Sequence, residues 1–95
     1  MKIALYTQRV EIVKSYGERR DCADQNIPRF IRACGYLPVP APNIPTLAEE
    51  LIRQINPAGI VLTGGNSLVK YGGDAPERDD TEKRILELAL EYEIP

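Results

Sequence analysis

Three short apolar runs alternate with three helical stretches along this chain, and this order constrains the fold more than any other feature. The apolar runs are IALY at 3–6, YLPVP at 36–40 and AGIVLT at 58–63. After each run comes a stretch in which apolar residues recur at the three- and four-residue spacing of an amphipathic helix. Strands that alternate with helices form parallel sheets joined by right-handed crossovers. We therefore predict an α/β fold built as β-α-β-α-β-α.

The segment between the first apolar run and the first helix has no clear period. It covers 7–20, is polar and contains Gly17, so we predict a long loop there. The first helical stripe consists of Ala23, Ile27, Phe30, Ile31 and Cys34. Gly35 follows, where a left-handed residue commonly ends a helix. Pro28 disfavours helical geometry in the residue before it, which predicts a helix that begins near Asn26 or carries a kink.

The second and third helices each have a predicted N-terminal cap. Thr46 and Glu49 have the spacing of a capping box, and Asp79 and Glu82 repeat it. The predicted buried faces consist of Leu47, Leu51, Ile52 and Ile55 in the second helix, and of Ile85, Leu88, Ala89 and Tyr92 in the third. An apolar third helix with no strand after it favours the N-terminal piece of a longer domain. A complete small α/β domain is the alternative.

The second and third apolar runs predict different positions in the sheet. Pro38 and Pro40 lack N–H donors, which favours an edge strand. The run Ile60–Leu62 is continuous rather than alternating, which is typical of a strand covered on both faces.

The composition excludes several classes of function. A chain of 95 residues with 43% hydrophobic and 27% charged residues makes at most one globular domain. Its net charge of −2 offers no electrostatic footprint for nucleic acid or an anionic membrane. The apolar runs are far shorter than a membrane span, and the absence of a signal-peptide pattern predicts a cytoplasmic protein. The chain has no histidine, and we expect no metal and no cofactor.

The two cysteines are predicted to be free thiols without a catalytic role. Cys22 and Cys34 do not have the CxxC spacing of a redox or metal motif. Cys34 lies on the apolar stripe of the first helix and is predicted to be buried. Cys22 lies at the predicted start of that helix, without the flanking glycines that a nucleophile elbow needs.

The third apolar run ends at the pair Gly64 and Gly65. Ligands of open α/β sheets bind beyond the carboxyl ends of the strands, and glycine lets a ligand approach the backbone closely. The pair could form an oxyanion hole or a tight turn without chemistry. A phosphate-binding loop is not supported, because neither G-x-G-x-x-G nor G-x-x-x-x-G-K-[ST] occurs.

The residues around the glycine pair resemble a known family. The segments that carry the resemblance are IVLTGGNSL at 60–68, YG at 71–72, RDxxE at 78–82 and IP at 94–95. Together they resemble class I glutamine amidotransferase-like hydrolases, and within these the γ-glutamyl-γ-aminobutyrate hydrolase (peptidase C26) branch. The segments TQR at 7–9 and SYGERRDC at 15–22 are similar to a subgroup that hydrolyses γ-glutamyl-CDP-amidate. The resemblance runs the length of the chain and implies a flavodoxin-like three-layer fold.

The resemblance also implies roles for the glycine loop. The second glycine of the family's pair donates its backbone N–H to the oxyanion, and that position is Gly65 here. Asn66 and Ser67, with Gly64, would then line the γ-glutamyl end of the substrate. The family's nucleophilic cysteine and its histidine base have no counterpart in these 95 residues.

Four charged residues near the predicted cleft each have two interpretations. Arg9 and Arg78 could bind a substrate carboxylate or phosphate through a guanidinium fork, or they could be solvated surface arginines. Asp79 and Glu82 border the cleft in the family, and both could also serve as helix N-terminal carboxylates.

These observations predict the N-terminal segment of a cysteine-dependent hydrolase that cleaves a γ-glutamyl amide bond and is inactive by itself. Its partners would be a small γ-glutamyl substrate and either the remainder of the same protein or a second copy. Two alternatives stay open. One is the glutaminase domain of an amidotransferase that supplies ammonia to a synthase. The other is a non-catalytic α/β module that binds a small ligand.

Overall fold

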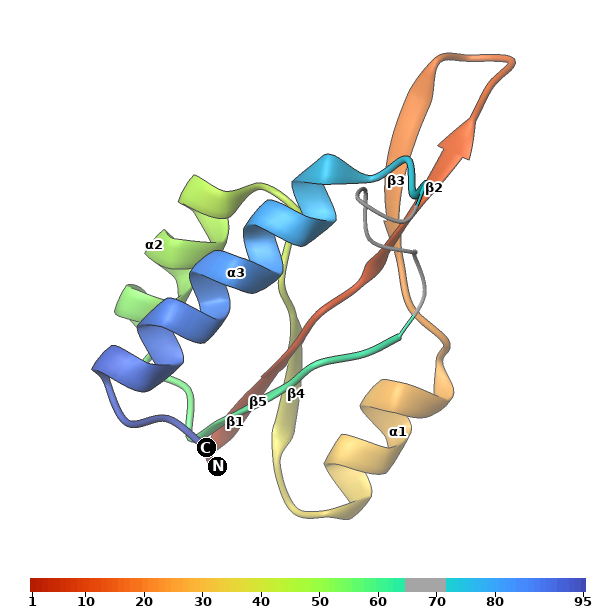
Figure 1. Cartoon of the computed structure of the whole chain (residues 1–95). Coiled ribbons are helices and arrows are strands. Elements are labelled where there is room, and N and C mark those ends of the chain that lie inside the picture. Colours follow the sequence, from red (N-terminus) through yellow and green to blue (C-terminus); the bar gives the residue numbers. More distant parts are fainter. Residues whose placement is uncertain (65–71) are drawn as a thin grey trace.

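A computed structural model describes residues 1–64 and 72–95 of the chain (Figure 1). The elements in chain order are β1 (Ile3–Tyr6), β2 (Arg9–Val13), β3 (Glu18–Cys22), α1 (Asn26–Ala33), β4 (Leu37–Pro40), α2 (Pro45–Ile55), β5 (Gly59–Val61) and α3 (Pro76–Glu91). The predicted mixed α/β fold is confirmed, and β1 has the bounds that its apolar run predicted.

β1 lies in the centre of a three-stranded parallel sheet with the order β4-β1-β5. Ile3 is the register partner of Leu37 in β4, and Ala4 is the partner of Gly59 in β5. β4 is therefore at one side of the sheet, which confirms the edge position that its two prolines predicted. The three strands run in the same direction, so their carboxyl ends meet at one end of the sheet.

Helices cover the two faces of this sheet unequally. Successive side chains of a strand point to opposite faces, so Leu5 enters one core while Ala4 and Tyr6 enter the other. The core shared with α2 and α3 consists of Leu5, Ala41, Ala48, Ile52, Ile85 and Leu88. The smaller core beneath α1 consists of Ala4, Tyr6 and Ile31. Figure 1 shows α2 and α3 together on one side of the sheet and α1 on the other.

The segment predicted as a long loop contains an antiparallel hairpin, so that prediction was wrong. β2 pairs with β3 in a register from Arg9↔Cys22 to Val13↔Glu18. The turn includes Gly17 at a φ of +62°, which suits a residue without a Cβ. The sequence of β3 is ERRDC, whose charged residues hide the usual strand pattern. Figure 1 shows the hairpin projecting beyond the carboxyl ends of the parallel strands.

The predicted caps of α2 and α3 were also wrong. α2 begins at Pro45, which places Thr46 inside the helix, and neither helix has a side-chain cap hydrogen bond. α3 begins at Pro76, so Asp79 lies within its first turn rather than at its cap. Proline suits a first helical position because its ring presets φ and its missing N–H would have no acceptor inside the helix.

The first helix ends as predicted. α1 begins at Asn26, and Gly35 follows its C-cap at a φ of +94°. Cys34, predicted to be buried, is exposed, because α1 turns its Ile31 rather than Cys34 into the core. Cys22 is half-buried at the end of β3 and not at a helix start.

Some of the predicted buried faces are only partly covered. Val61 and Leu62 are 38% and 47% exposed, so the described residues do not cover β5 on both faces. Leu47 and Tyr92 are exposed as well, while the small Ala48 and the polar Thr81 are buried in their helices. Periodicity predicted which side of each helix faces the core, but not how far the buried surface extends around the helix.

No helix in the described ranges is long and apolar enough to cross a membrane.

Candidate functional site

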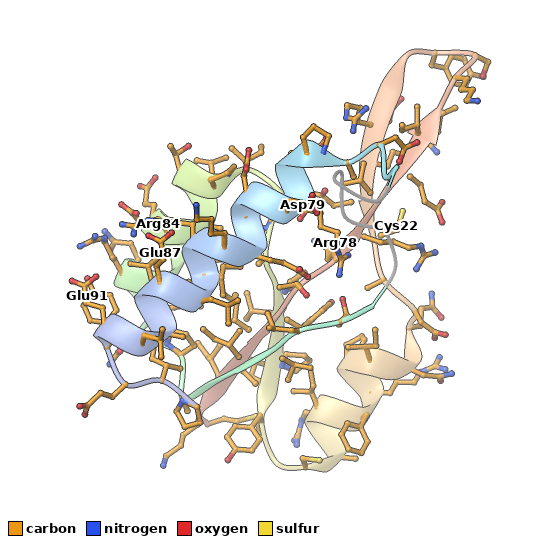
Figure 2. All side chains as sticks on the ribbon, in the orientation of Figure 1. Cys22, Arg78, Asp79, Arg84, Glu87 and Glu91 are labelled. Atoms are coloured by element: carbon orange, nitrogen blue, oxygen red, sulfur yellow. The ribbon has the colours of Figure 1, made fainter. Side chains whose placement is uncertain are left out.

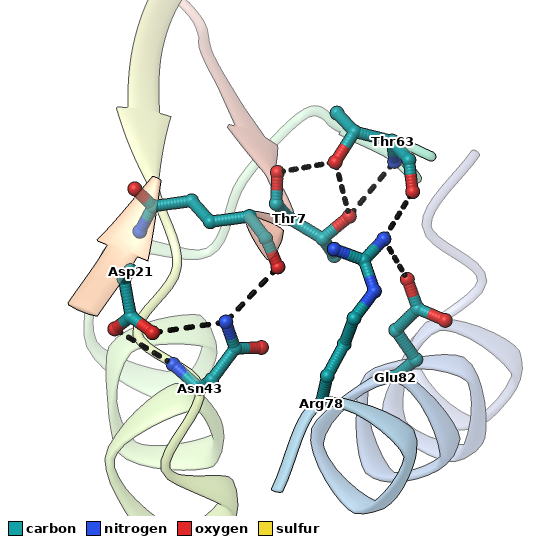
Figure 3. Close-up of polar contacts among 7 residues, drawn as sticks. Thr7, Asp21, Asn43, Thr63, Arg78 and Glu82 are labelled. Carbon is teal, nitrogen blue, oxygen red and sulfur yellow. Dashed lines mark hydrogen bonds and ion pairs between the residues drawn. The ribbon is translucent and has the colours of Figure 1, made fainter. Parts of the chain in front are cut away.

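The carboxyl ends of β1 and β5 meet beside the first turn of α3. Beyond β1 the chain continues into Thr7, and beyond β5 it reaches Thr63 and Gly64. Figure 3 shows Thr7 and Thr63 next to each other, with Arg78 reaching them from α3. In open α/β sheets this end of the strands is where ligands bind.

A set of hydrogen bonds joins Thr7 to Thr63. The N–H of Thr63 donates to Oγ1 of Thr7 at 2.8 Å, and Oγ1 of Thr63 donates to the carbonyl oxygen of Thr7 at 2.7 Å. The two hydroxyl oxygens are 3.2 Å apart, and Thr7 is 1% exposed. The pairing of β1 with β5 therefore extends beyond both strands and holds the peptide that leads into Gly64.

Arg78 of α3 contacts the peptide between Thr63 and Gly64, on the side away from Thr7. Its Nη2 donates to the carbonyl oxygen of Thr63 and, at 2.9 Å, to Oε1 of Glu82 one turn further along α3. The residue is only 3% exposed, and its Nη1 has no hydrogen-bond partner among the described residues. Burial of a cation is costly unless it is paired, and Glu82 supplies the opposite charge. The predicted Arg78 thus lies next to the peptide between Thr63 and Gly64, but as a buried group.

Arg9, the other predicted anion-binding arginine, is engaged elsewhere. Its Nε and Nη2 donate to Oε1 of Glu11 at 3.0 and 2.7 Å. Hydrogen bonding and the charge of Arg9 lower the pKa of Glu11. No hydrogen bond or ion pair joins Arg9 to Thr63, Gly64 or Arg78 within the described part of the chain. A substrate anion at Arg9 would have to displace Glu11.

A second polar cluster lies at the base of the hairpin. Asn43, which is 4% exposed, donates its Nδ2 to Oδ1 of Asp21 at 2.9 Å and its N–H to Oδ2 at 3.1 Å. The same Nδ2 also donates to the carbonyl oxygen of Gln8 at 2.9 Å. These contacts tie the hairpin to the loop that follows β4. Sequence reasoning missed this cluster, because no local spacing relates Asp21 to Asn43.

The other side of the hairpin is tied to the start of α3. Nη2 of Arg19 donates to Oε1 of Glu77 at 2.7 Å and to the carbonyl oxygen of Asp74 at 2.9 Å. The hydrogen bond from Arg19 lowers the pKa of Glu77. Arg19 and Arg78 thus each hold one backbone carbonyl, on either side of the segment 64–73.

Gly64 lines a hollow of about 470 Å³ on the α1 face of the sheet. Its walls include the apolar Ile27, Phe30 and Ile31 of α1. Asp24 and Asn26, at the N-terminal end of that helix, line it as well. A Cβ added at Gly64 would meet nothing within 4 Å. No described residue accepts a hydrogen bond from the N–H of Gly64. The strand end therefore offers a backbone donor beside open space.

Three predicted site residues, Gly65, Asn66 and Ser67, lie outside the described residues, and their roles stay predictions. Asp79, by contrast, lies in the first turn of α3, where the helix dipole favours a carboxylate. Within 1–64 and 72–95 no group of three or more His, Cys, Asp or Glu side chains could hold a metal ion.

Neither the scan against protein-family models nor the search of curated proteins gives a match to this chain.

Proposed function

We propose that this chain is the N-terminal part of a flavodoxin-like, cysteine-dependent hydrolase that cleaves a γ-glutamyl amide bond. The observation that carries the proposal is the end of β5, where Gly64 leaves a backbone N–H without a described acceptor beside a hollow of about 470 Å³. Of the three parallel strands, β1 is first in the chain, β4 second and β5 third. The order β4-β1-β5 places β4 on one side of β1 and β5 on the other. Flavodoxin-like sheets begin in the same way and bind ligands between the first and third strands.

The reaction needs what a glycine loop can supply. A thiolate attacks the γ-carbonyl carbon, and the carbonyl oxygen becomes negatively charged. Collapse of the tetrahedral intermediate, with a proton from the conjugate acid of the base, expels the amine and leaves a γ-glutamyl thioester. Water then hydrolyses the thioester to glutamate and releases the thiol. Backbone N–H groups stabilise the oxyanion in both steps, and loss of one donor typically lowers the rate about 10²–10³-fold. Gly65 is the predicted donor, while Gly64, Asn66 and Ser67 line the γ-glutamyl group.

The nucleophile and base would come from the remainder of the domain. A contact at the outer edge of β5 supports such a continuation. The N–H of Ile60 donates to the carbonyl oxygen of Pro95 at 2.8 Å, so a strand that continued from Pro95 would lie beside β5. Apolar hollows of about 320 and 270 Å³ lie on the two faces of the sheet at this edge, and both include Ile60 and Pro95. A further parallel strand beside β5 would place alternate side chains in the two hollows.

The proposal predicts the effect of Gly65→Val in the full-length enzyme. A Cβ disfavours a glycine turn and fills space beside the amide, so kcat should fall by about 10²–10³-fold, as when an oxyanion donor is lost. The measurement is the hydrolysis rate of L-glutamine and of γ-glutamyl-p-nitroanilide.

Ala33→Val is the matched control, because Ala33 is an exposed residue at the end of α1. It should keep the wild-type rate. Normal turnover by Gly65→Val would remove Gly65 from the mechanism. Failure of the wild-type full-length protein to hydrolyse either compound would overturn the proposed function itself.

A further inference from the structure

We propose that Arg78 and Thr7 form a clamp on Thr63 that directs the N–H of Gly64 into the hollow on the α1 face. Arg78 is then a positioning residue, and Gly64 is a second oxyanion donor beside the predicted Gly65. The role of the clamp in catalysis rests on the proposed function. The hydrogen bonds that form the clamp do not depend on that function.

The direction of the Gly64 amide follows from the contact that Arg78 makes. In a trans peptide the N–H points opposite to the preceding carbonyl, and the structure contains no cis peptide bond in the ranges that it describes. Arg78 holds the carbonyl oxygen of Thr63 from the α3 side. The N–H of Gly64 therefore points away from α3, towards the face where Gly64 lines the hollow with α1.

The clamp restrains this peptide from both of its ends. Thr7 binds both the N–H and the hydroxyl group of Thr63, at 2.8 and 2.7 Å, while Arg78 binds the carbonyl group. Thr7 and Arg78 are 1% and 3% exposed, so water does not compete for these hydrogen bonds. A donor that is fixed before the reaction needs no reorganisation when charge develops on the substrate.

The charge of Arg78 also makes the amide a better donor. Charge-assisted hydrogen bonds are roughly twice as strong as neutral ones, and linked hydrogen bonds polarise one another. A guanidinium on the carbonyl oxygen of Thr63 draws electron density from the whole peptide group, including the N–H of Gly64. Glu82, 2.9 Å from Nη2, holds the guanidinium in place. Figure 2 shows Arg78 near the strand ends, while Arg84 and Glu87 lie on the side of α3 that faces α2.

The clamp can be tested on the ¹⁵N-labelled chain without any enzymatic activity. L-Glutamate is the probe, because its γ-carboxylate resembles the oxyanion in charge. In the wild type, L-glutamate should shift the Gly64 amide resonance downfield. Arg78→Met should move that resonance upfield and reduce the response to L-glutamate, and Arg78→Lys should restore part of it. The matched control is Arg84→Met, which removes another arginine of α3, one that pairs with Glu49 of α2 and with Glu87 of α3.

Two results would overturn the clamp. One is a Gly64 amide in the wild type that does not respond to L-glutamate. The other is a folded Arg78→Met chain whose Gly64 resonance and response equal those of the wild type. Should Arg78→Met fail to fold, the nearly isosteric Thr7→Val tests the same peptide, because it removes the acceptor of the Thr63 N–H. An unchanged Gly64 response in Thr7→Val would also overturn the clamp.

Kinetics of the full-length enzyme separate positioning from direct substrate binding. A misplaced donor costs up to about 10²-fold in rate, so Arg78→Met should lower kcat with KM unchanged. Direct binding of a substrate carboxylate by Arg78 predicts the reverse, a raised KM with kcat unchanged. An enzyme without γ-glutamyl activity would contradict the proposed function and leave the amide measurement to decide on the clamp.

Discussion

The arginines of this chain show how the surroundings of a single residue determine its use. Arg78 is 3% exposed and binds a backbone carbonyl, whereas the side chain of Arg9 is 37% exposed and pairs with Glu11 two residues away. An exposed pair of this kind contributes little to the free energy of unfolding, because solvent screens the two charges. Removing one partner of a buried pair commonly costs about 3–5 kcal/mol. Arg78 is therefore the arginine whose substitution most needs a test of folding.

Glu77 should make the stability of the chain depend on pH. Arg19 lowers the pKa of Glu77 below its ordinary value of 4.5 in the folded chain. A lowered folded-state pKa contributes stability above the unfolded-state pKa, and this contribution is lost as the pH falls through the folded-state value. The difference in free energy of unfolding between the wild type and Glu77→Gln should therefore be largest near neutral pH and shrink below 4.5.

Urea denaturation from about pH 3 to pH 7 measures this difference across the titration of a carboxyl group. Glu91→Gln is the control, because Glu91 makes no ion pair among the described residues and lies at the end of α3. Its effect on stability should not follow the same curve. A Glu77→Gln difference that stays constant over this range would show that the ion pair contributes nothing to folding.

At the scale of the element, the hairpin of β2 and β3 is held at two places. Asn43 and Asp21 tie its base to the loop after β4, and Arg19 ties it to Glu77 and Asp74 at the start of α3. An isolated two-stranded hairpin is marginally stable in water. The two attachments, together with the buried Val10, therefore keep the hairpin against the carboxyl end of the sheet.

Asp21→Ala should loosen the hairpin more than it affects the parallel sheet. It leaves the buried Asn43 without two hydrogen bonds, which costs about 1–3 kcal/mol for an unsatisfied polar group. Hydrogen exchange of the β2 and β3 amides should become faster, while exchange in β1 changes less.

Glu18→Ala is the matched control on the same strand. Glu18 pairs with Arg20 on the surface, and their side chains are 52% and 50% exposed. Its substitution should change exchange little, because such a pair contributes about 0–1 kcal/mol. Equal exchange rates in Asp21→Ala and the wild type would mean that the Asn43 cluster does not hold the hairpin.

At the scale of the whole molecule, apolar surface gathers beside the outer edge of β5, the edge that faces away from β1. Leu86 and Leu90 on α3 are 48% and 81% exposed, and Leu62 beyond β5 is 47% exposed. Among the described residues no further strand pairs with this edge. A strand edge of this kind next to apolar side chains favours association with another chain or segment. The proposed larger sheet would cover this surface, whereas a self-sufficient binding module would leave it exposed.

The chain of 95 residues by itself should therefore self-associate. Leu86→Lys with Leu90→Lys should shift it towards the monomer, because charges on this face oppose its burial. Analytical ultracentrifugation measures the shift. Leu47→Lys on α2, at a residue that is 47% exposed but does not line the hollows at the β5 edge, is the control.

A wild-type chain that is monomeric and melts cooperatively would favour the small complete module instead. Such a result would contradict the proposed larger sheet, while the amide measurement at Gly64 would still test the clamp.

What the sequence determined by itself was local. The alternation of apolar runs and helical stripes predicted the parallel α/β order, the bounds of β1 and the left-handed Gly35 after α1. These features depend on backbone preferences and on side chains a few positions apart, which a pattern in one segment records. The resemblance around the glycine pair gave the functional hypothesis in the same way, from contiguous residues.

The tertiary structure alone decided which groups are buried and which lie together. The charged strand β3 forms because β2 lies beside it, Cys34 is exposed because Ile31 faces the core, and Arg78 is buried because Thr63 lies 15 positions away in sequence but in contact with it. Pairing and burial depend on partners distant along the chain, and no spacing within one segment encodes them.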